Sequence, residues 1–273
     1  MKAIRIDIND YEYAGQGANG QSFNHRTDPG VMLKLYNSSA PYEIIENELE
    51  CAHKAYELGI PTPKPGDFVT DGKGRFGIRF ERIPDKISYS RAVGNNPQDV
   101  EYYARHFADL CLQLHSIHLE RGTFTDIKEF NRNILSNSTI YTATERSVLE
   151  RYINGAPDGD TAIHGDLQFS NAIIAGGRSY LIDLGDFACG SPLFDLGMVL
   201  FTCCYDNVDF LRNEFHMEPE TAAMFWHYFV KQYFGEDADP HQKASELRPY
   251  AALKLLIIER NSGVIPEYHW LIQ

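Results

Sequence analysis

The chain has 273 residues, which fits one large domain or two small ones and is long enough for a buried core. Hydrophobic residues make up 43% of it and the formal net charge is −13, so the composition is that of an acidic globular protein and not of a disordered one. The acidic excess argues against nucleic acid or a membrane surface as a partner, because both attract surplus Lys and Arg.

The cysteines and the apolar segments bear on the compartment. The five cysteines form no CxxC pair, and their odd number favours reduced thiols over a disulfide framework. Residues 1–10 alternate apolar and charged side chains and lack the apolar run of a signal peptide. The longest apolar stretch, residues 196–205, is about half the ~20 residues that a membrane-spanning helix needs. We therefore expect a cytoplasmic protein without a membrane partner.

Strand patterns dominate the first eighty residues, beginning with an expected edge strand at residues 4–8. Asp28-Pro29-Gly30 is turn chemistry and predicts a hairpin between two of the strands. One helix, from about residue 43 to 58, interrupts the set and ends at Gly59, because neither Gly nor the following prolines continue a helix. The other predicted strands are residues 11–14, 21–25, 31–36 and 76–83.

Helical periodicity replaces the strand pattern after Pro84, with only a short strand pair between residues 163 and 182. The predicted helices include residues 100–117, 219–234 and 242–261. We infer a small β-rich lobe, residues 1–82, and a larger α-rich lobe, residues 83–273, joined near residues 81–85.

A glycine-rich segment lies between the second and third predicted strands. It consists of Gly15, Gln16, Gly17, Ala18, Asn19 and Gly20 and matches G-x-G-x-x-G. A dinucleotide fold would open a helix after the third glycine, whereas here a strand follows. A glycine loop between antiparallel strands suits a lid whose backbone N–H groups approach phosphates. The alternative is an ordinary glycine-rich hairpin.

Lys34 and Glu48 form the second candidate feature. Strand alternation puts Lys34 on one face with Met32 and Tyr36. In the helix that follows, Glu48 falls near the centre of the apolar arc, where a carboxylate is tolerated only with a partner. Lys34 is the natural partner, and the pair would hold the ammonium toward phosphate oxygens. The alternative is a Glu48 side chain that reaches solvent or bonds to the backbone.

The third feature is the segment of residues 161–183. Two apolar runs around Gly176-Gly177-Arg178 predict a hairpin, and pairing residue 175 with 179 would place Asn171 opposite Asp183, next to Asp166. Mg²⁺ takes oxygen ligands and commonly uses one or two protein groups together with substrate phosphates. We therefore predict a metal–nucleotide site in which Asp166 accepts a proton from an attacking hydroxyl group. The alternative is a polar loop with Asp and Asn in turns.

With these motifs the sequence resembles the protein-kinase-like superfamily, most closely the branch of aminoglycoside phosphotransferases and choline kinases. The resemblance runs from the glycine segment to Asp183 and a downstream Pro192 and Asp195. It implies an α+β, protein-kinase-like bilobal fold with a small antiparallel β-rich N-lobe that carries one helix and a larger, mainly α-helical C-lobe.

The resemblance also implies roles in a reaction that uses ATP and Mg²⁺. Asp166 would be the catalytic base or the group that orients the hydroxyl, Asn171 and Asp183 would bind Mg²⁺, and Lys34 would contact the α- and β-phosphates. The other positions implied at the nucleotide are Gly15, Gly17, Ala18, Asn19 and Gly20 over the phosphates, Glu48 beside Lys34, and Glu81 and Ile83 in the linker that holds adenine.

Departures from protein kinases narrow the acceptor. Gly165 stands where those enzymes carry an Arg that reads an activation-loop phosphate, and Asp195 follows Asp183 too closely for a long activation segment. We therefore expect a kinase that acts on a hydroxyl group of a small molecule. A nucleotide-binding pseudokinase-like module and an atypical protein kinase are the alternatives.

The charge is unevenly divided between the two predicted lobes. Residues 1–82 carry 10 basic and 12 acidic side chains, and the remaining residues carry 15 and 26. Acidic groups in the acceptor-binding lobe would attract a cationic acceptor such as an aminoglycoside, choline or an amino sugar. A generally acidic surface is the alternative reading, and the sequence leaves the oligomeric state open.

Overall fold

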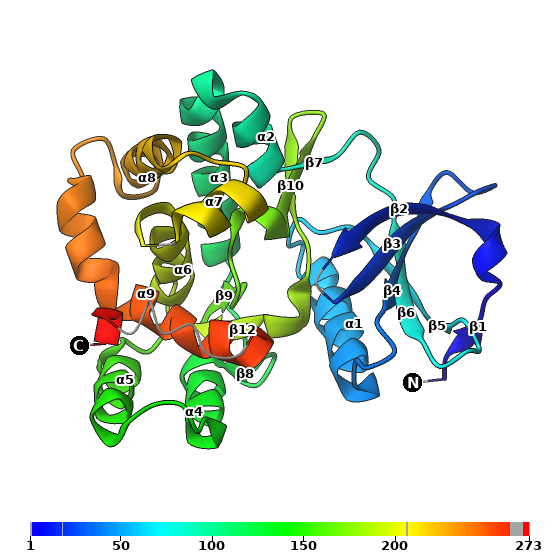
Figure 1. Ribbon diagram of the computed structural model, residues 1–273, viewed down its shortest axis with the longest axis horizontal. Helices are drawn as coiled ribbons and strands as arrows, with labels where there is room; N and C mark the ends of the chain where they lie inside the picture. The colour runs from blue at the N-terminus through cyan, green and yellow to red at the C-terminus, as the bar shows by residue number, and fades with distance from the viewer. Residues whose placement is uncertain (1, 18, 206, 263–269, 273) are drawn as a thin grey trace. The chain divides into compact units, whose positions relative to one another are not determined.

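The computed structural model describes residues 2–17, 19–205, 207–262 and 270–272 (Figure 1). The chain divides into two compact units, one of Met1–Lys86 with Ile173–Asp186 and one of Ile87–Ala172 with Phe187–Gln273. The predicted division at residue 82 did not foresee that residues 173–186 belong with the first unit. No helix within the described ranges is both long enough and apolar enough to span a membrane.

A six-stranded sheet forms the first unit, with the strand order β1-β5-β6-β4-β3-β2 (Figure 1). All neighbouring strands are antiparallel except β1 and β5, and β1 lies at the edge as predicted. The strands are β1 (Ile4–Arg5), β2 (Tyr11–Gly17), β3 (Gly20–His25), β4 (Val31–Tyr36), β5 (Pro65–Thr70) and β6 (Phe76–Glu81), and a 3-10 turn, η1 (Ile8–Asp10), separates β1 from β2.

Among the six strands of this sheet, β5 is the one that the sequence did not predict. It begins with Pro65-Gly66-Asp67, which is turn chemistry, and its register on β6 shifts between Pro65 and Phe68. Phe68 and Val69 are buried nevertheless, because β6 supplies a ladder along which their side chains enter the core. Tertiary pairing has overridden a weak local propensity here.

The two faces of β4 enter different apolar clusters. Leu33 and Leu35 are buried with Ile6 and with residues of β2, β3 and β5, whereas Tyr36 packs with Ile45 and Leu49 of the helix α1 (Tyr42–Glu57). The predicted alternation of the strand is therefore confirmed. Since Lys34 and Tyr36 are two residues apart, α1 covers the face on which the lysine lies.

Helix α1 buries a narrower face than its sequence indicated. Helical spacing puts Ile44, Tyr56 and Leu58 on the apolar side with Ile45, but Ile44 is 57% exposed and the other two are also exposed. Ile44 lies one residue from the buried Ile45, so the two side chains point about 100° apart on the helix. The residues of α1 that are buried are Ile45, Glu48, Leu49, Cys51, Ala52 and Ala55.

The hairpin of β10 (Ala172–Ala175) and β11 (Arg178–Leu181) has a tighter turn than predicted. Gly176 and Gly177 both have positive φ, at 54° and 75°, which is typical of a two-residue turn that matches the strand twist. Arg178, expected in the turn, is the first residue of β11. A 3-10 turn, η4 (Leu184–Asp186), follows and packs on α1, where Asn47 Nδ2 donates to the Gly185 carbonyl over 3.0 Å.

Helices dominate the second unit, and the predicted α+β class is confirmed. The helix predicted over residues 219–234 is α8 (Pro219–Phe234), and those at 100–117 and 242–261 are α3 (Val100–His115) and α9 (Pro240–Ser262). The remaining elements are β7 (Ile87–Ser88), α2 (Tyr89–Asn95), η2 (Pro97–Asp99), β8 (Thr125–Asp126), α4 (Ile127–Asn137), α5 (Ala143–Gly155), β9 (Thr161–Ile163), η3 (Phe169–Asn171), β12 (Ala188–Gly190), α6 (Leu193–Cys204) and α7 (Val208–Glu214).

The core of this unit gathers aromatic rings around the segment that follows β9. Phe169 of η3 contacts Phe107 of α3 and Phe225 of α8, with ring centroids 5.5 and 4.5 Å apart. Helix α6 lies against α9, and a side chain at Gly197 would come within 2.5 Å of Tyr250, so the missing Cβ lets the two helices approach closely. Of the two adjacent thiols near the end of α6, Cys203 is buried and Cys204 is exposed.

Candidate active site

Lys34 lies at the centre of the polar cluster in the first unit. Its Nζ is 2.7 Å from Glu48 Oε1 and 3.0 Å from Asp183 Oδ1, and it lies 4.9 Å from the centroid of the Tyr36 ring. Glu48 is only 4% exposed, as the apolar arc of α1 predicted. Burial disfavours the charged form of Lys34, but the carboxylates of Glu48 and Asp183 outweigh it and raise the lysine pKa. The ammonium group therefore stays protonated.

Asp183 joins this cluster in a strained backbone conformation. It follows β11 with φ at 63°, the left-handed region that a residue other than glycine adopts at a cost. Its side chain is 40% exposed, and one carboxylate oxygen contacts Lys34. Strain of this kind persists where the surroundings hold a residue in place, and here it sets an exposed carboxylate beside a fixed ammonium group.

The glycine-rich segment is a β2–β3 hairpin whose last ladder pair is Gly17 with Gly20. A Cβ at Gly20 would lie 2.3 Å from the Leu35 carbonyl oxygen, so this glycine lets β3 approach β4 closely. Gly15 lies at a register shift opposite Ser22, and the Asn19 carbonyl accepts from the Asn37 N–H over 3.0 Å. Ala18 lies outside the described residues.

In the linker at the end of β6, two backbone N–H groups already donate hydrogen bonds to other residues. The N–H of Glu81 donates to Lys64 and that of Arg82 to Gly30, each over 2.8 Å, and Ile83 is buried. The Glu81 side chain also accepts from the Lys64 N–H over 3.3 Å. The linker is thereby held to the sheet on both sides.

In the second unit, a buried carboxylate holds the loop that leaves β9. Asp195 of α6, with no exposed surface, accepts from the N–H of His164 over 2.7 Å and from that of Gly165 over 3.0 Å. Gly165 has a φ of 81°, which its lack of a Cβ permits. The chain therefore turns at a defined point just before Asp166.

His115 of α3 completes the support of this loop. Its Nε2 lies 3.1 Å from Asp195 Oδ2 and its Nδ1 lies 2.8 Å from the hydroxyl of Tyr233. A buried imidazole with a partner on each nitrogen is fixed in orientation. His115 thereby holds the Asp195 carboxylate under the loop.

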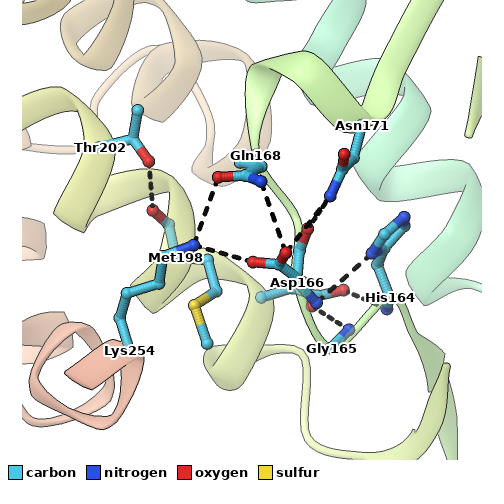
Figure 2. A network of polar contacts seen from close by, with 9 residues as sticks. His164, Gly165, Asp166, Gln168, Asn171, Met198, Thr202 and Lys254 are labelled. Atoms are coloured by element: carbon cyan, nitrogen blue, oxygen red, sulfur yellow. Dashed lines mark hydrogen bonds and ion pairs between the residues drawn. The ribbon is translucent and has the colours of Figure 1, made fainter. Parts of the chain in front are cut away.

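Asp166 lies in a network of polar contacts (Figure 2). Its Oδ1 is 2.8 Å from Lys254 Nζ, and its Oδ2 is 3.4 Å from the amide nitrogens of both Gln168 and Asn171. The same Asn171 nitrogen donates to the Asp166 backbone carbonyl over 3.0 Å. Because the amide nitrogen faces Asp166, the amide oxygen of Asn171 is the atom that could ligate a metal ion.

A family model for the phosphotransferase enzyme family APH matches residues 11–229. The chain belongs to this family. The protein is therefore a small-molecule phosphotransferase, and the family resemblance described from its motifs is confirmed. A search of curated protein sequences gave no match.

Solved structures confirm the predicted protein-kinase-like fold. A thermostable mutant of aminoglycoside phosphotransferase APH(4)-Ia, in a ternary complex with ADP and hygromycin B, is 14% identical with a TM-score of 0.67, covering 97% of this chain and 91% of that one. Aminoglycoside-3'-phosphotransferase of type VIII is 20% identical with a TM-score of 0.58, covering 89% and 94%. A choline/ethanolamine kinase family protein from Mesorhizobium loti is 18% identical with a TM-score of 0.56, covering 96% and 84%.

The carboxylate of Asp166 in this phosphotransferase stays ionised. Burial raises the pKa of such a group, but the charge and hydrogen bond of Lys254, with smaller contributions from His164 and Arg260, lower it below its ordinary value. Only 14% of the Asp166 side chain is exposed. The phosphotransferase thus keeps a negative charge in an enclosed place.

Each unit brings together some of the residues that the sequence singled out. Lys34, Glu48 and Asp183 meet in the first unit, and Asp166 contacts Asn171 in the second. The sequence reading missed Lys254 and Gln168 and did not assign Asp195 a contact. Lys254 carried a usable signal, because it is the one charged residue in the apolar run of residues 251–258. The sequence alone does not show that Lys254 contacts Asp166, because the two residues are 88 positions apart.

Proposed function

We propose that this phosphotransferase transfers the γ-phosphoryl group of ATP, with Mg²⁺, to a hydroxyl group of a small molecule. The observation that carries the proposal is the enclosed, ionised Asp166 at the end of β9, on a loop that Asp195 holds. In the transfer, the acceptor oxygen forms a bond to the γ-phosphorus as the bond to the ADP oxygen breaks, and Asp166 accepts the hydroxyl proton.

The first unit would bind the nucleotide. Lys34, fixed by Glu48, offers a permanent positive charge to the α- and β-phosphates, and the glycine hairpin of residues 15–20 would cover them. At the linker the N–H groups of Glu81 and Arg82 already donate hydrogen bonds to Lys64 and Gly30. Adenine would therefore bind to the N–H of Ile83 and the carbonyl of Glu81. Structural neighbours that carry ADP or AMP-PNP also support a nucleotide.

Asn171 and Asp183 would hold Mg²⁺. Each contributes an oxygen ligand of the hard type that this ion prefers, and the exposed Asp183 carboxylate has one oxygen that does not contact Lys34. When bound, Mg²⁺ neutralises charge on the phosphate oxygens during transfer. Each side chain thus offers an oxygen of the kind that such a cation binds when phosphates and water complete its coordination.

The acceptor would be an alcohol of modest size. A neighbouring structure was solved with hygromycin B, which supports a sugar-like or amino-sugar acceptor. The acidity of residues 83–273 supports a cationic acceptor, because the acidic side chains would attract its positive charge. All five cysteines are free thiols, which supports a reducing compartment such as the cytoplasm. We propose neither nucleic acid nor a membrane as a partner.

A screen for ADP release tests the function. The protein is incubated with Mg-ATP and with neutral alcohols, sugars, choline-like alcohols and aminoglycosides, and at least one acceptor should accelerate ADP release. Asp166→Asn should then lose turnover by ~10²- to 10⁴-fold, because the proton acceptor is gone, while calorimetry still detects Mg-ATP binding. Asp160→Asn is the control, since that carboxylate is 68% exposed. Unchanged turnover in Asp166→Asn would contradict the proposal.

A further inference from the structure

Helix α9 places a buried lysine against the proposed catalytic carboxylate. Lys254 is 7% exposed, its Nζ lies 2.8 Å from Asp166 Oδ1, and the Gln168 amide oxygen is 3.4 Å away (Figure 2). The pair joins residues 88 positions apart in the chain. A single helix thus reaches back to the loop after β9.

The surroundings of Lys254 make the charge costly. Its neighbours along α9 are apolar and buried, and removing an ammonium group from water costs several kcal/mol before its partner offsets the loss. An apolar side chain of similar size would stabilise such a position about as well. The residues of this run, all buried, are Ala251, Ala252, Leu253, Leu255, Leu256 and Ile257. Stability alone does not explain the lysine.

The helix cannot easily withdraw Lys254. Gly197 of α6 lies against Tyr250, where a Cβ would come within 2.5 Å of the helix, and Tyr250 is four residues before Lys254. Four residues make about one helical turn, so this close packing lies directly beneath the lysine. The ammonium group is therefore supplied from a rigid element.

The contacts divide the two oxygens of Asp166 between different tasks. Oδ1 has the short contact to Lys254, whereas Oδ2, within the part of the chain that the structure describes, has two contacts of 3.4 Å, from the amides of Gln168 and Asn171. A contact of 3.4 Å is long for an N–H···O hydrogen bond. Oδ2 is therefore the oxygen with capacity for a hydroxyl donor.

We propose that Lys254 is a positioning residue for phosphoryl transfer. It holds Asp166 by Oδ1, so that Oδ2 faces the acceptor hydroxyl in one orientation. The inference rests on the proposed function, because it assigns Oδ2 the proton of that reaction. Positioning of this kind affects the rate strongly, since an error of about 1 Å in a reacting group can cost ~10²-fold.

A cycle of variants tests the role, using the acceptor that the wild type turns over fastest. Lys254→Met should lower kcat by ~10²-fold and leave the KM for ATP unchanged, since the first unit retains Lys34. Lys254→Arg should recover part of the rate, because a guanidinium can still contact Oδ1. Lys243→Met is the matched control, because Lys243 lies on the same helix and pairs with Glu246. This substitution is expected to leave kcat unchanged.

The double variant Asp166→Asn with Lys254→Met separates positioning from other effects. Since Lys254→Met alone leaves a buried carboxylate unpaired and can unfold the protein, the double variant also restores neutrality. If Lys254 acts through Asp166, the double variant is no slower than Asp166→Asn, because the two losses are not additive. Additive losses would overturn the inference.

Three further outcomes are distinct from one another. A folded Lys254→Met with wild-type kcat overturns the positioning role and leaves the proposed function intact. A folded wild-type protein that phosphorylates no acceptor overturns the proposed function and, with it, the role of Lys254. A fall in melting temperature without the split between kcat and KM would identify the pair as structural, which also overturns the inference.

Discussion

Each unit of the molecule pairs a lysine with a carboxylate that is largely shielded from solvent, and the two pairs differ in how far apart their residues lie in the chain. Lys34 and Glu48 are 14 residues apart, on a strand and the helix that covers it, whereas Lys254 and Asp166 are 88 residues apart. The first lysine has a second, exposed carboxylate in Asp183, while the second has the Gln168 amide. The first pair therefore lies beside a carboxylate that is exposed to solvent, whereas the second pair is enclosed.

The difference teaches how each ammonium group can act. Lys34 has carboxylates on a buried side and an exposed side, so a phosphate can replace or join the exposed partner. Lys254 is directed at a single carboxylate and fixes it. The same chemical pair thus suits ligand binding in one unit and alignment in the other.

The largest expected effect concerns the loop that supports the second pair. Asp195→Asn should lower the free energy of unfolding by about 3–5 kcal/mol, because two backbone N–H groups and His115 lose a buried carboxylate. Urea unfolding measures it. Asp160→Asn, in the exposed His118–Asp160 pair, should leave stability nearly unchanged. Equal losses in the two variants would show that the buried network does not stabilise the loop.

The next effect separates the two lysines. Lys34→Met should weaken Mg-ADP binding by ~10²-fold, close to 3 kcal/mol, because it removes a fixed charge from the phosphates. Lys254→Met should leave the same affinity unchanged. Isothermal titration calorimetry gives both dissociation constants. The two lysines would not differ in role as described if both variants lost affinity for Mg-ADP to the same extent, or if Lys34→Met lost none.

The glycine hairpin gives a smaller effect, again confined to one unit. Gly20→Ala should destabilise the protein by about 1–3 kcal/mol, since the new Cβ meets the Leu35 carbonyl next to Lys34. Gly155→Ala at the end of α5 is the control, because nothing lies within 4 Å of the added carbon. Thermal unfolding measures both. A neutral Gly20→Ala would mean that β3 and β4 can separate without cost.

The smallest effect is at an ion pair in the first unit, between the buried Asp71 and the partly exposed Arg75. Burial raises the pKa of Asp71, but the N–H groups of Lys73 and Arg75 and the Arg75 guanidinium outweigh it and lower the pKa. A carboxyl group whose pKa is lowered in the folded state stabilises the fold at pH values above its ordinary pKa of about 3.9. This stabilisation is lost as the pH falls through the pKa of the folded state. Asp71→Asn should cost about 1 kcal/mol at pH 7 and less in acid, measured by unfolding at both pH values. A cost that is independent of pH would contradict this.

Local patterns made much of the fold predictable. Strand alternation gave β4 with its two faces, and the bounds of α8 agree with its periodicity. The burial of Glu48 followed from its place among apolar neighbours and needed no knowledge of the sheet. Fold class and family could thus be predicted, because each depends on motifs spanning a few residues.

Elements held by distant contacts were missed. Helix α5 buries only Leu149 and Ile153, so its periodicity is too weak to stand out. Lys254 is as conspicuous in its apolar run as Glu48 is in its arc, but its partner is set by the packing of α9 on α6. A short-range signal shows that a charge needs a partner, and only the tertiary structure names a partner 88 residues away.

The return of residues 173–186 to the first unit affects how the protein is made. Synthesis proceeds from the N-terminus, and domains generally fold as units as they emerge. Here the first unit cannot be complete when Lys86 emerges, because Asp183 and the hairpin of β10 and β11 are still to be translated. Throughout that interval Lys34 has Glu48 but not Asp183, so the nascent sheet must hold together on its own core until the second carboxylate arrives.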